Sequence, residues 1–226
     1  MSALPGELLP DFVSDAYHGT AAVDAGLARL GLRREDLYVA VRKGVEERGL
    51  VTEFDPSTAD GLRDWMARVR ELRRLYHRKG WTPENRANAP FMVSPDGDVY
   101  VGVMQGNEHT GNPDGRLESY HEIGSVNANL TAHNDLVGMA IPGIDEYLGL
   151  GKAEVAKTWF VVTRYEEDKT GERRVHLEVS QPAPTSQGQK ITSWAKRLCL
   201  EPIGFKPVVR VDTPAREGAL VTVEMR

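Results

Sequence analysis

Residues 57–103 read STADGLRDWMARVRELRRLYHRKGWTPENRANAPFMVSPDGDVYVGV, and they contain the change of periodicity that decides the fold. In the first half, five apolar residues recur every three or four positions: Leu62, Trp65, Val69, Leu72 and Tyr76. This spacing predicts one continuous amphipathic helix over 57–79 that buries these side chains. After Pro90 the apolar residues alternate instead, which predicts strands at 91–93 and 98–103 joined by a Ser94-Pro95-Asp96-Gly97 turn.

The flanking sequence also predicts helices before this change of periodicity and mainly strands after it. Two shorter helical patterns precede this stretch, at 22–30 and about 35–48, and a short helix is expected around 126–135. A long hairpin over 158–181 and a strand pair at 206–213 and 219–226 follow it. Helices first and strands later predict an α+β fold, with an N-terminal three-helix portion packed on a predominantly antiparallel sheet. We expect a single domain over 1–226, comprising an irregular arm (1–20), a helical portion (22–80) and mainly strands (90–226).

Composition narrows the class of protein. The chain has 226 residues, 40% of them hydrophobic, and a formal net charge of -5, so it can form a normal core and is not basic throughout. Its single cysteine, Cys199, permits no internal disulfide and is expected to be an inert buried thiol. The N-terminus lacks a signal-peptide pattern, and no apolar run is long enough for a membrane helix. We therefore expect a cytoplasmic protein without membrane contact.

The helix predicted over 57–79 has a basic outer face. Seven cationic residues lie there, against Asp64 and Glu71 in the same span: Arg63, Arg68, Arg70, Arg73, Arg74, Arg78 and Lys79. Such a face can contact phosphates. The first function we consider is therefore an accessory binding protein that contacts nucleic acid or a protein partner. Its expected binding residues are Arg70, Arg73, Arg74 and Arg78 on the helix, with Asn107 and Thr110 in the following loop.

Residues 104–151 form a long polar, glycine-rich region with three of the six histidines, His109, His121 and His133. Long ordered loops of this kind often carry binding or catalysis. Imidazole and carboxylate are ligands for divalent metal ions, so His109, His121, His133 and Asp135 are metal-ligand candidates. The histidines are twelve residues apart, so only the tertiary fold could bring them together, and isolated loop histidines are the alternative.

The second function considered is a metal-assisted hydrolase or transferase acting on a phosphate-containing substrate. Its catalytic candidates are His109, His121 and Glu122. Binding is slightly favoured over catalysis, because no acid, base and nucleophile are recognisable together.

Two further patterns leave alternatives open. Residues 106–112 could present backbone N–H groups to an anion, but two tight turns explain their glycines equally well. Asp168 and Glu178 have the order of carboxylates in restriction-type nucleases, although the lysine that should follow Glu178 is absent.

Several blocks carry a resemblance that spans much of the chain: LGLRREDLYVAVRKG (30–44), LRRLYHRKGW (72–81), NAPFMVSPDGDVYVGVMQGNEHTGN (88–112), VHLEVSQP (175–182) and ITSWAKRLCL (191–200). In this order they resemble a group of uncharacterised bacterial proteins, some of them carried on mobile elements. The resemblance implies no particular activity.

Overall fold

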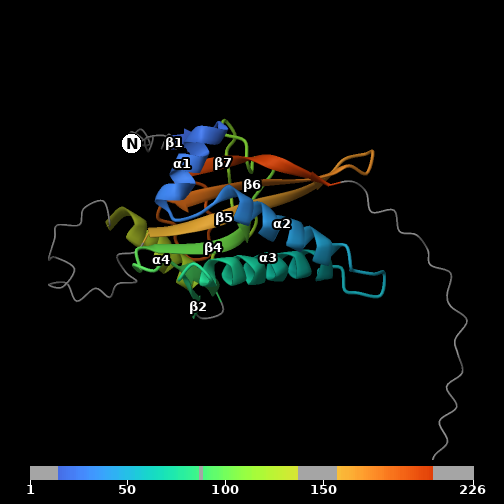
Figure 1. Cartoon of the computed structure of the whole chain (residues 1–226), viewed down its shortest axis with the longest axis horizontal. Helices are drawn as coiled ribbons and strands as arrows, with labels where there is room; N and C mark the ends of the chain where they lie inside the picture. The colour runs from blue at the N-terminus through green and yellow to red at the C-terminus, as the bar shows by residue number, and fades with distance from the viewer. Residues whose placement is uncertain (1–14, 87–88, 137–156, 206–226) are drawn as a thin grey trace, which may run out of the picture.

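The computed structural model describes residues 15–86, 89–136 and 157–205, which form one mixed sheet flanked by helices (Figure 1). The helices are α1 (Thr20–Arg29), α2 (Arg34–Arg48), α3 (Ala59–His77) and α4 (Ser125–Leu136). The strands are β1 (Asp15–Tyr17), β2 (Thr82–Arg86), β3 (Ala89–Val93), β4 (Val99–Gln105), β5 (Lys157–Glu167), β6 (Arg173–Pro182) and β7 (Trp194–Phe205).

The described sheet has seven strands in the order β1-β7-β6-β5-β4-β3-β2. Neighbouring strands are antiparallel except for β1 with β7 and β4 with β5. The predicted α+β fold with three N-terminal helices and a predominantly antiparallel sheet is thus confirmed. Because β4 and β5 are parallel, Gln105 at the carboxyl end of β4 lies beside Thr163, and β5 continues for four residues beyond this point.

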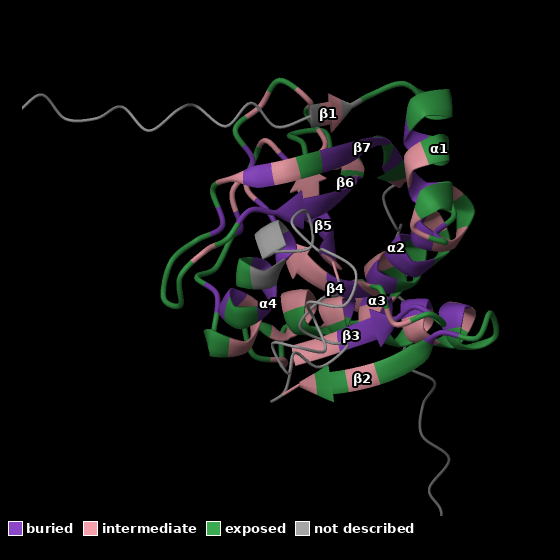
Figure 2. Cartoon of the chain, turned by 90° about the vertical axis from the view of Figure 1, so that its left-hand side faces the viewer, coloured by how far each residue is buried: buried purple, intermediate pink, exposed green. Residues whose placement is uncertain are grey.

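Successive side chains of the central strands point to opposite faces of the sheet, so a hydrophobic core forms on each face. Val161 packs in the core formed with α1, α2 and α3, whereas its neighbours Phe160 and Val162 pack in the core that includes Ala128 and Leu130 of α4. Figure 2 shows these helices on opposite sides of a sheet whose inner strands are buried. Both faces of the central strands are therefore covered, which explains their continuous apolar run.

Helix α3 is rotated relative to the sequence expectation. Leu72 and Tyr76 are buried as predicted, but Leu62 is 53% exposed, and Trp65 and Val69 are only half-buried. The buried face includes instead Asp64 and Arg68, which pair with each other. The prediction that all five apolar side chains are buried was therefore wrong, and the physical reason is that two opposite charges four residues apart can enter a core together.

Other differences concern element bounds. The irregular arm expected over 1–20 contains strand β1 and the first residue of α1, and β2 precedes the first predicted strand. Strand β7 was not predicted, because polar residues interrupt its apolar run. Helix α4 and the turn at 94–97 are confirmed, with Gly97 at φ 84°. The expected strand pair at 206–226 and part of the 104–151 region lie outside the described residues. No helix in the described part of the chain is long and apolar enough to cross a membrane.

Candidate functional site

A cavity opens at the carboxyl end of β4, beside Thr163–Tyr165 of β5, and α3 and the loop that follows β4 also line it. Its volume is about 560 Å³, within the usual range for ligand sites. The described residues that line it come from five separate segments: Arg48, Asp64, Arg68, Gln105, Gly106, Asn107, Glu108, His109, Arg116, Glu118, Tyr120, Thr163, Arg164, Tyr165 and Lys190. We call this hollow the cationic cavity.

Positive charge exceeds negative charge in this lining. Among the described residues it contains five Lys or Arg side chains and three Asp or Glu side chains, although the whole chain has a net charge of -5. Local concentration of one sign of charge in a hollow with protein walls attracts ligands of the opposite sign. The cavity is therefore suited to an anion.

The cations at the mouth of the cavity have few partners. Arg116 and Lys190 are exposed and form no ion pair with any described residue, and Arg164 donates a hydrogen bond of 3.3 Å to the carbonyl oxygen of Glu108. Arg48 pairs with Asp60 and lies 4.2 Å over the ring centre of Tyr165. Arg116, Lys190 and Arg164 thus retain donors for a ligand.

The floor of the cavity is a buried ion pair. Arg68 Nη2 donates to Asp64 Oδ2 at 2.5 Å, and Arg68 Nη1 donates to Thr163 Oγ1. Asp64 Oδ1 and Arg68 Nε are buried and have no hydrogen-bond partner among the described residues. Burial raises the pKa of the Asp64 carboxyl, and the Arg68 guanidinium opposes that shift. Gly44 of α2 lies against this pair, since a β-carbon there would come within 2.7 Å of Arg68 Nε.

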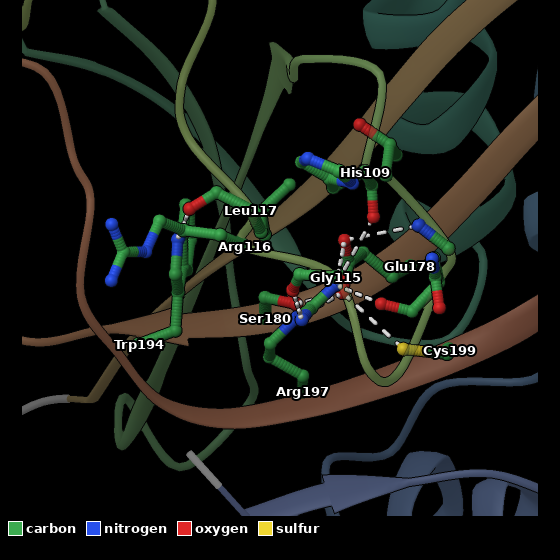
Figure 3. A network of polar contacts seen from close by, with 12 residues as sticks. His109, Gly115, Arg116, Leu117, Glu178, Ser180, Trp194, Arg197 and Cys199 are labelled. Atoms are coloured by element: carbon green, nitrogen blue, oxygen red, sulfur yellow. Dashed lines mark hydrogen bonds and ion pairs between the residues drawn. The ribbon is translucent and has the colours of Figure 1, made fainter. Parts of the chain in front are cut away.

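The loop over 106–119 forms one wall, and a second buried ion pair holds it (Figure 3). On the α4 face of the sheet, Arg197 donates to both carboxylate oxygens of Glu178, at 2.8 and 3.0 Å. The same guanidinium donates to the loop carbonyls of Gly115 (2.7 Å) and Asn112 (3.0 Å). Figure 3 shows Arg116 pointing away from this network. The Arg197 side chain thus fixes a loop that presents other residues to the cavity.

Glu178 is saturated by this arrangement. Besides Arg197, its carboxylate accepts hydrogen bonds from Ser180 Oγ (3.1 Å) and from the backbone N–H of Gly111 (3.2 Å). The nuclease alternative is therefore wrong: Glu178 is fully buried, and Asp168 accepts bonds from Thr170 and Glu172 within its own turn. Cys199 lies beside Glu178 and is buried as expected, and burial raises the pKa of its thiol to about 12, which disfavours the reactive thiolate.

The anion nest considered for 106–112 is also wrong. The N–H groups of Gly106, Asn107, His109, Thr110, Gly111 and Asn112 all donate to acceptors within the protein. Thr110, expected to bind a ligand, is buried, and its hydroxyl donates to the carbonyl oxygen of Asn107 at 2.8 Å. Asn107 lines the cationic cavity, but its side-chain amide donates to the carbonyl of Arg116 at 2.9 Å. Both residues therefore shape the loop.

The histidine candidates are divided between two hollows. His109 lines the cationic cavity, with Nε2 3.9 Å from Glu108 Oε1. His121 and Glu122 line a neighbouring hollow and are exposed. The side chains of His133 and Asp135 lie outside the described residues. Among the side chains that are described, no group of three or more His, Cys, Asp or Glu is placed to hold a metal ion.

The basic face of α3 is largely engaged within the fold. Arg73 donates to the carbonyl oxygens of Glu84 and Phe91 and to Asn85 Oδ1, which ties α3 to the β2–β3 hairpin. Arg74 pairs with Glu71, and Arg70 lies 3.7 Å from Glu47. Arg68, which we expected on the outer face, is buried. Arg78 is exposed and has no ion pair with a described residue.

The neighbouring hollow has a volume of about 610 Å³ and borders the cationic cavity, since Gln105 and Tyr120 line both. Its other described lining residues are Thr58, Asp60, Gly61, Leu62, Trp65, Val103, Met104, Ser119, His121, Glu122, Ile123 and Asn127. We call it the apolar hollow, because more carbon surface than polar surface faces it.

Comparisons of the chain with protein-family models, with curated proteins and with solved structures gave no match. The resemblance to uncharacterised bacterial proteins stays a prediction.

Proposed function

We propose that this chain binds a small phosphate-containing anion in the cationic cavity. The observation that carries the proposal is the gathering of Arg48, Arg116, Arg164 and Lys190 around one half-enclosed hollow, with Arg116 and Lys190 in no ion pair with a described residue. Guanidinium groups bind phosphate oxygens through paired, charge-assisted hydrogen bonds, and ammonium groups bind them as point charges. A ligand with two or more negative charges would complement this lining.

Binding is proposed rather than catalysis. A phosphoryl-transfer enzyme needs a positioned nucleophile or a group that orients one. In the described lining, Thr163 Oγ1 already accepts a bond from Arg68, and His109 has only the distant Glu108 beside it. The metal-assisted hydrolase or transferase expected as the alternative stays a prediction, and a divalent cation could accompany the bound phosphate.

The basic face of α3 is the weaker binding surface for nucleic acid or a protein partner. Arg73 and Arg74 are already hydrogen-bonded within the fold, so binding there would exchange existing bonds for new ones. We also propose a cytoplasmic location, because the single cysteine is a buried thiol and is consistent with a reducing compartment.

The proposal can be tested by isothermal titration calorimetry with pyrophosphate at low and moderate salt. The site variant is Arg116→Gln/Lys190→Gln, and the matched control is Arg29→Gln/Lys169→Gln, which removes the same charge from exposed residues that line neither hollow. We expect the site variant to bind at least about tenfold more weakly, equivalent to about 1.4 kcal/mol, and the control to bind like wild type. No binding by wild type, or equal loss in both variants, would contradict the proposal.

A further inference from the structure

The apolar hollow can hold a second part of the ligand whose phosphate lies in the cationic cavity. It adjoins the cationic cavity along Gln105 and Tyr120, so one molecule can occupy both. The inference that follows rests on the proposed phosphate binding and identifies the ligand class more closely.

The apolar hollow offers surfaces on which a flat ring can stack. Tyr120 is 57% exposed at the border between the two hollows, and its ring meets that of His121 edge-on, with 4.8 Å between centroids. Leu62 of α3 is exposed and lines the same hollow, and Trp65, which also lines it, donates its indole N–H to the carbonyl oxygen of Val103 at 3.2 Å. Exposed aromatic and aliphatic side chains in a hollow are typical of sites for aromatic ligands.

Polar groups in the apolar hollow favour a ligand that can form hydrogen bonds. Asn127 Oδ1 is buried and has no hydrogen-bond partner among the described residues. A buried acceptor without a partner costs free energy, which a ligand N–H group would recover. Gln105 adds a second amide at the border with the cationic cavity. A purely hydrocarbon ligand would leave Asn127 Oδ1 unsatisfied, whereas a nitrogen heterocycle can donate to it.

Charge sets the orientation of the ligand. Asp60 and Glu122 line the apolar hollow, and the described residues there include no Lys or Arg. Phosphate groups are repelled from this end and attracted to the cationic cavity. The heterocycle and the phosphate must therefore lie in different hollows.

We propose that the ligand is a nucleotide, with its phosphate in the cationic cavity and its base in the apolar hollow. Tyr120 and Leu62 contact the faces of the base, and Asn127 accepts a hydrogen bond from its edge. Gln105 lies where the sugar joins the two parts.

The test compares ligands with and without the base. The four ribonucleoside 5′-monophosphates, ribose 5-phosphate and pyrophosphate are titrated into wild type, Tyr120→Ala and Arg116→Gln/Lys190→Gln. We expect at least one nucleotide to bind about tenfold or more tightly than ribose 5-phosphate, in line with the measured contribution of base stacking on aromatic side chains. Tyr120→Ala should reduce that advantage, because it should weaken nucleotide binding more than ribose 5-phosphate binding, and the charge variant should weaken both ligands.

The possible failures are distinguishable. If every nucleotide binds no more tightly than ribose 5-phosphate, the base site is wrong, although the phosphate site stands. If Tyr120→Ala leaves the nucleotide advantage intact, the base lies elsewhere and the nucleotide proposal is wrong in its placement. If neither pyrophosphate nor any nucleotide binds wild type, the proposed function itself fails.

Discussion

Replacing Arg197 by Met should destabilise the protein strongly, because the residue neutralises a carboxylate with no access to water. Arg197 is 2% exposed and Glu178 is 0% exposed. Met has similar length and fills the space, so the cost comes mainly from leaving Glu178 charged and unpaired and the carbonyls of Gly115 and Asn112 without their donor. Removing one partner of a buried pair costs about 3–5 kcal/mol. That is a large fraction of the roughly 5–15 kcal/mol by which most domains are stable.

The assay is urea unfolding, monitored by tryptophan fluorescence, for three variants. Arg197→Met should lose about 3–5 kcal/mol, and Glu178→Gln/Arg197→Met should be less destabilised by at least about 1 kcal/mol, because the amide still accepts hydrogen bonds but carries no charge. The control, Arg174→Met, removes an exposed arginine paired with Glu172 and should cost less than about 1 kcal/mol.

Two results would refute this reasoning. A loss below about 1 kcal/mol in Arg197→Met would mean that Glu178 is neutral or hydrated and that the pair does not hold the loop. A double variant as unstable as Arg197→Met would mean that the unpaired charge is not the source of the cost.

Three other predictions follow from close contacts and burial. Gly44→Ala should destabilise the protein by about 1–3 kcal/mol, because the new β-carbon would clash with the Asp64–Arg68 pair. The control Gly61→Ala in α3 meets only Gln105 Nε2 at 3.8 Å and should be neutral or stabilising by up to about 1 kcal/mol. Thermal unfolding of both variants measures the difference, and a Gly44→Ala variant as stable as wild type would contradict the packing. Native Cys199 should resist iodoacetamide at pH 8–9 and react only after unfolding, and rapid labelling of the native protein would disprove its burial. Because folding raises the pKa of its thiol from 9.0 to about 12, the free energy of unfolding should fall as the pH rises between these two values. Arg73→Ala should lower the midpoint temperature of thermal unfolding, because it removes the hydrogen bonds that hold the β2–β3 hairpin against α3. The control Arg78→Ala should leave this midpoint unchanged. Equal midpoints in the two variants would show that the Arg73 hydrogen bonds do not stabilise the fold.

The fold class could be predicted because periodicity reports local structure directly. The change from helical spacing to alternation near Pro90 places the helices before the strands, and turn residues such as Gly97 mark the hairpin. Periodicity failed for the burial of α3, because Asp64 and Arg68 read as surface charges until their pairing is known. It also failed for β7, where Arg197 looks like an exposed residue although it is buried against Glu178.

The candidate site could be predicted only in part. The loop after β4 was identified from its glycines and polar residues, and His109 and Asn107 do line the cationic cavity. Arg48, Arg116, Arg164 and Lys190 were missed, because they meet only through the tertiary fold. The spacing of these residues along the chain does not indicate that they lie close together in space. The unpaired cations of the cavity therefore became apparent only from the structure.

Phosphate binding in the cationic cavity is tested most directly by a nuclear magnetic resonance titration of isotope-labelled protein with pyrophosphate. Phosphate binding in the cationic cavity predicts saturable shifts of the amides of Gln105–Tyr120 and Thr163–Tyr165 and of the side-chain signals of Arg116 and Arg164. Little change is expected from Arg70 of α3 to its C-cap Arg78. Shifts concentrated on Arg70–Arg78 and absent from the cavity would contradict this binding site and assign the anion to the basic face of α3.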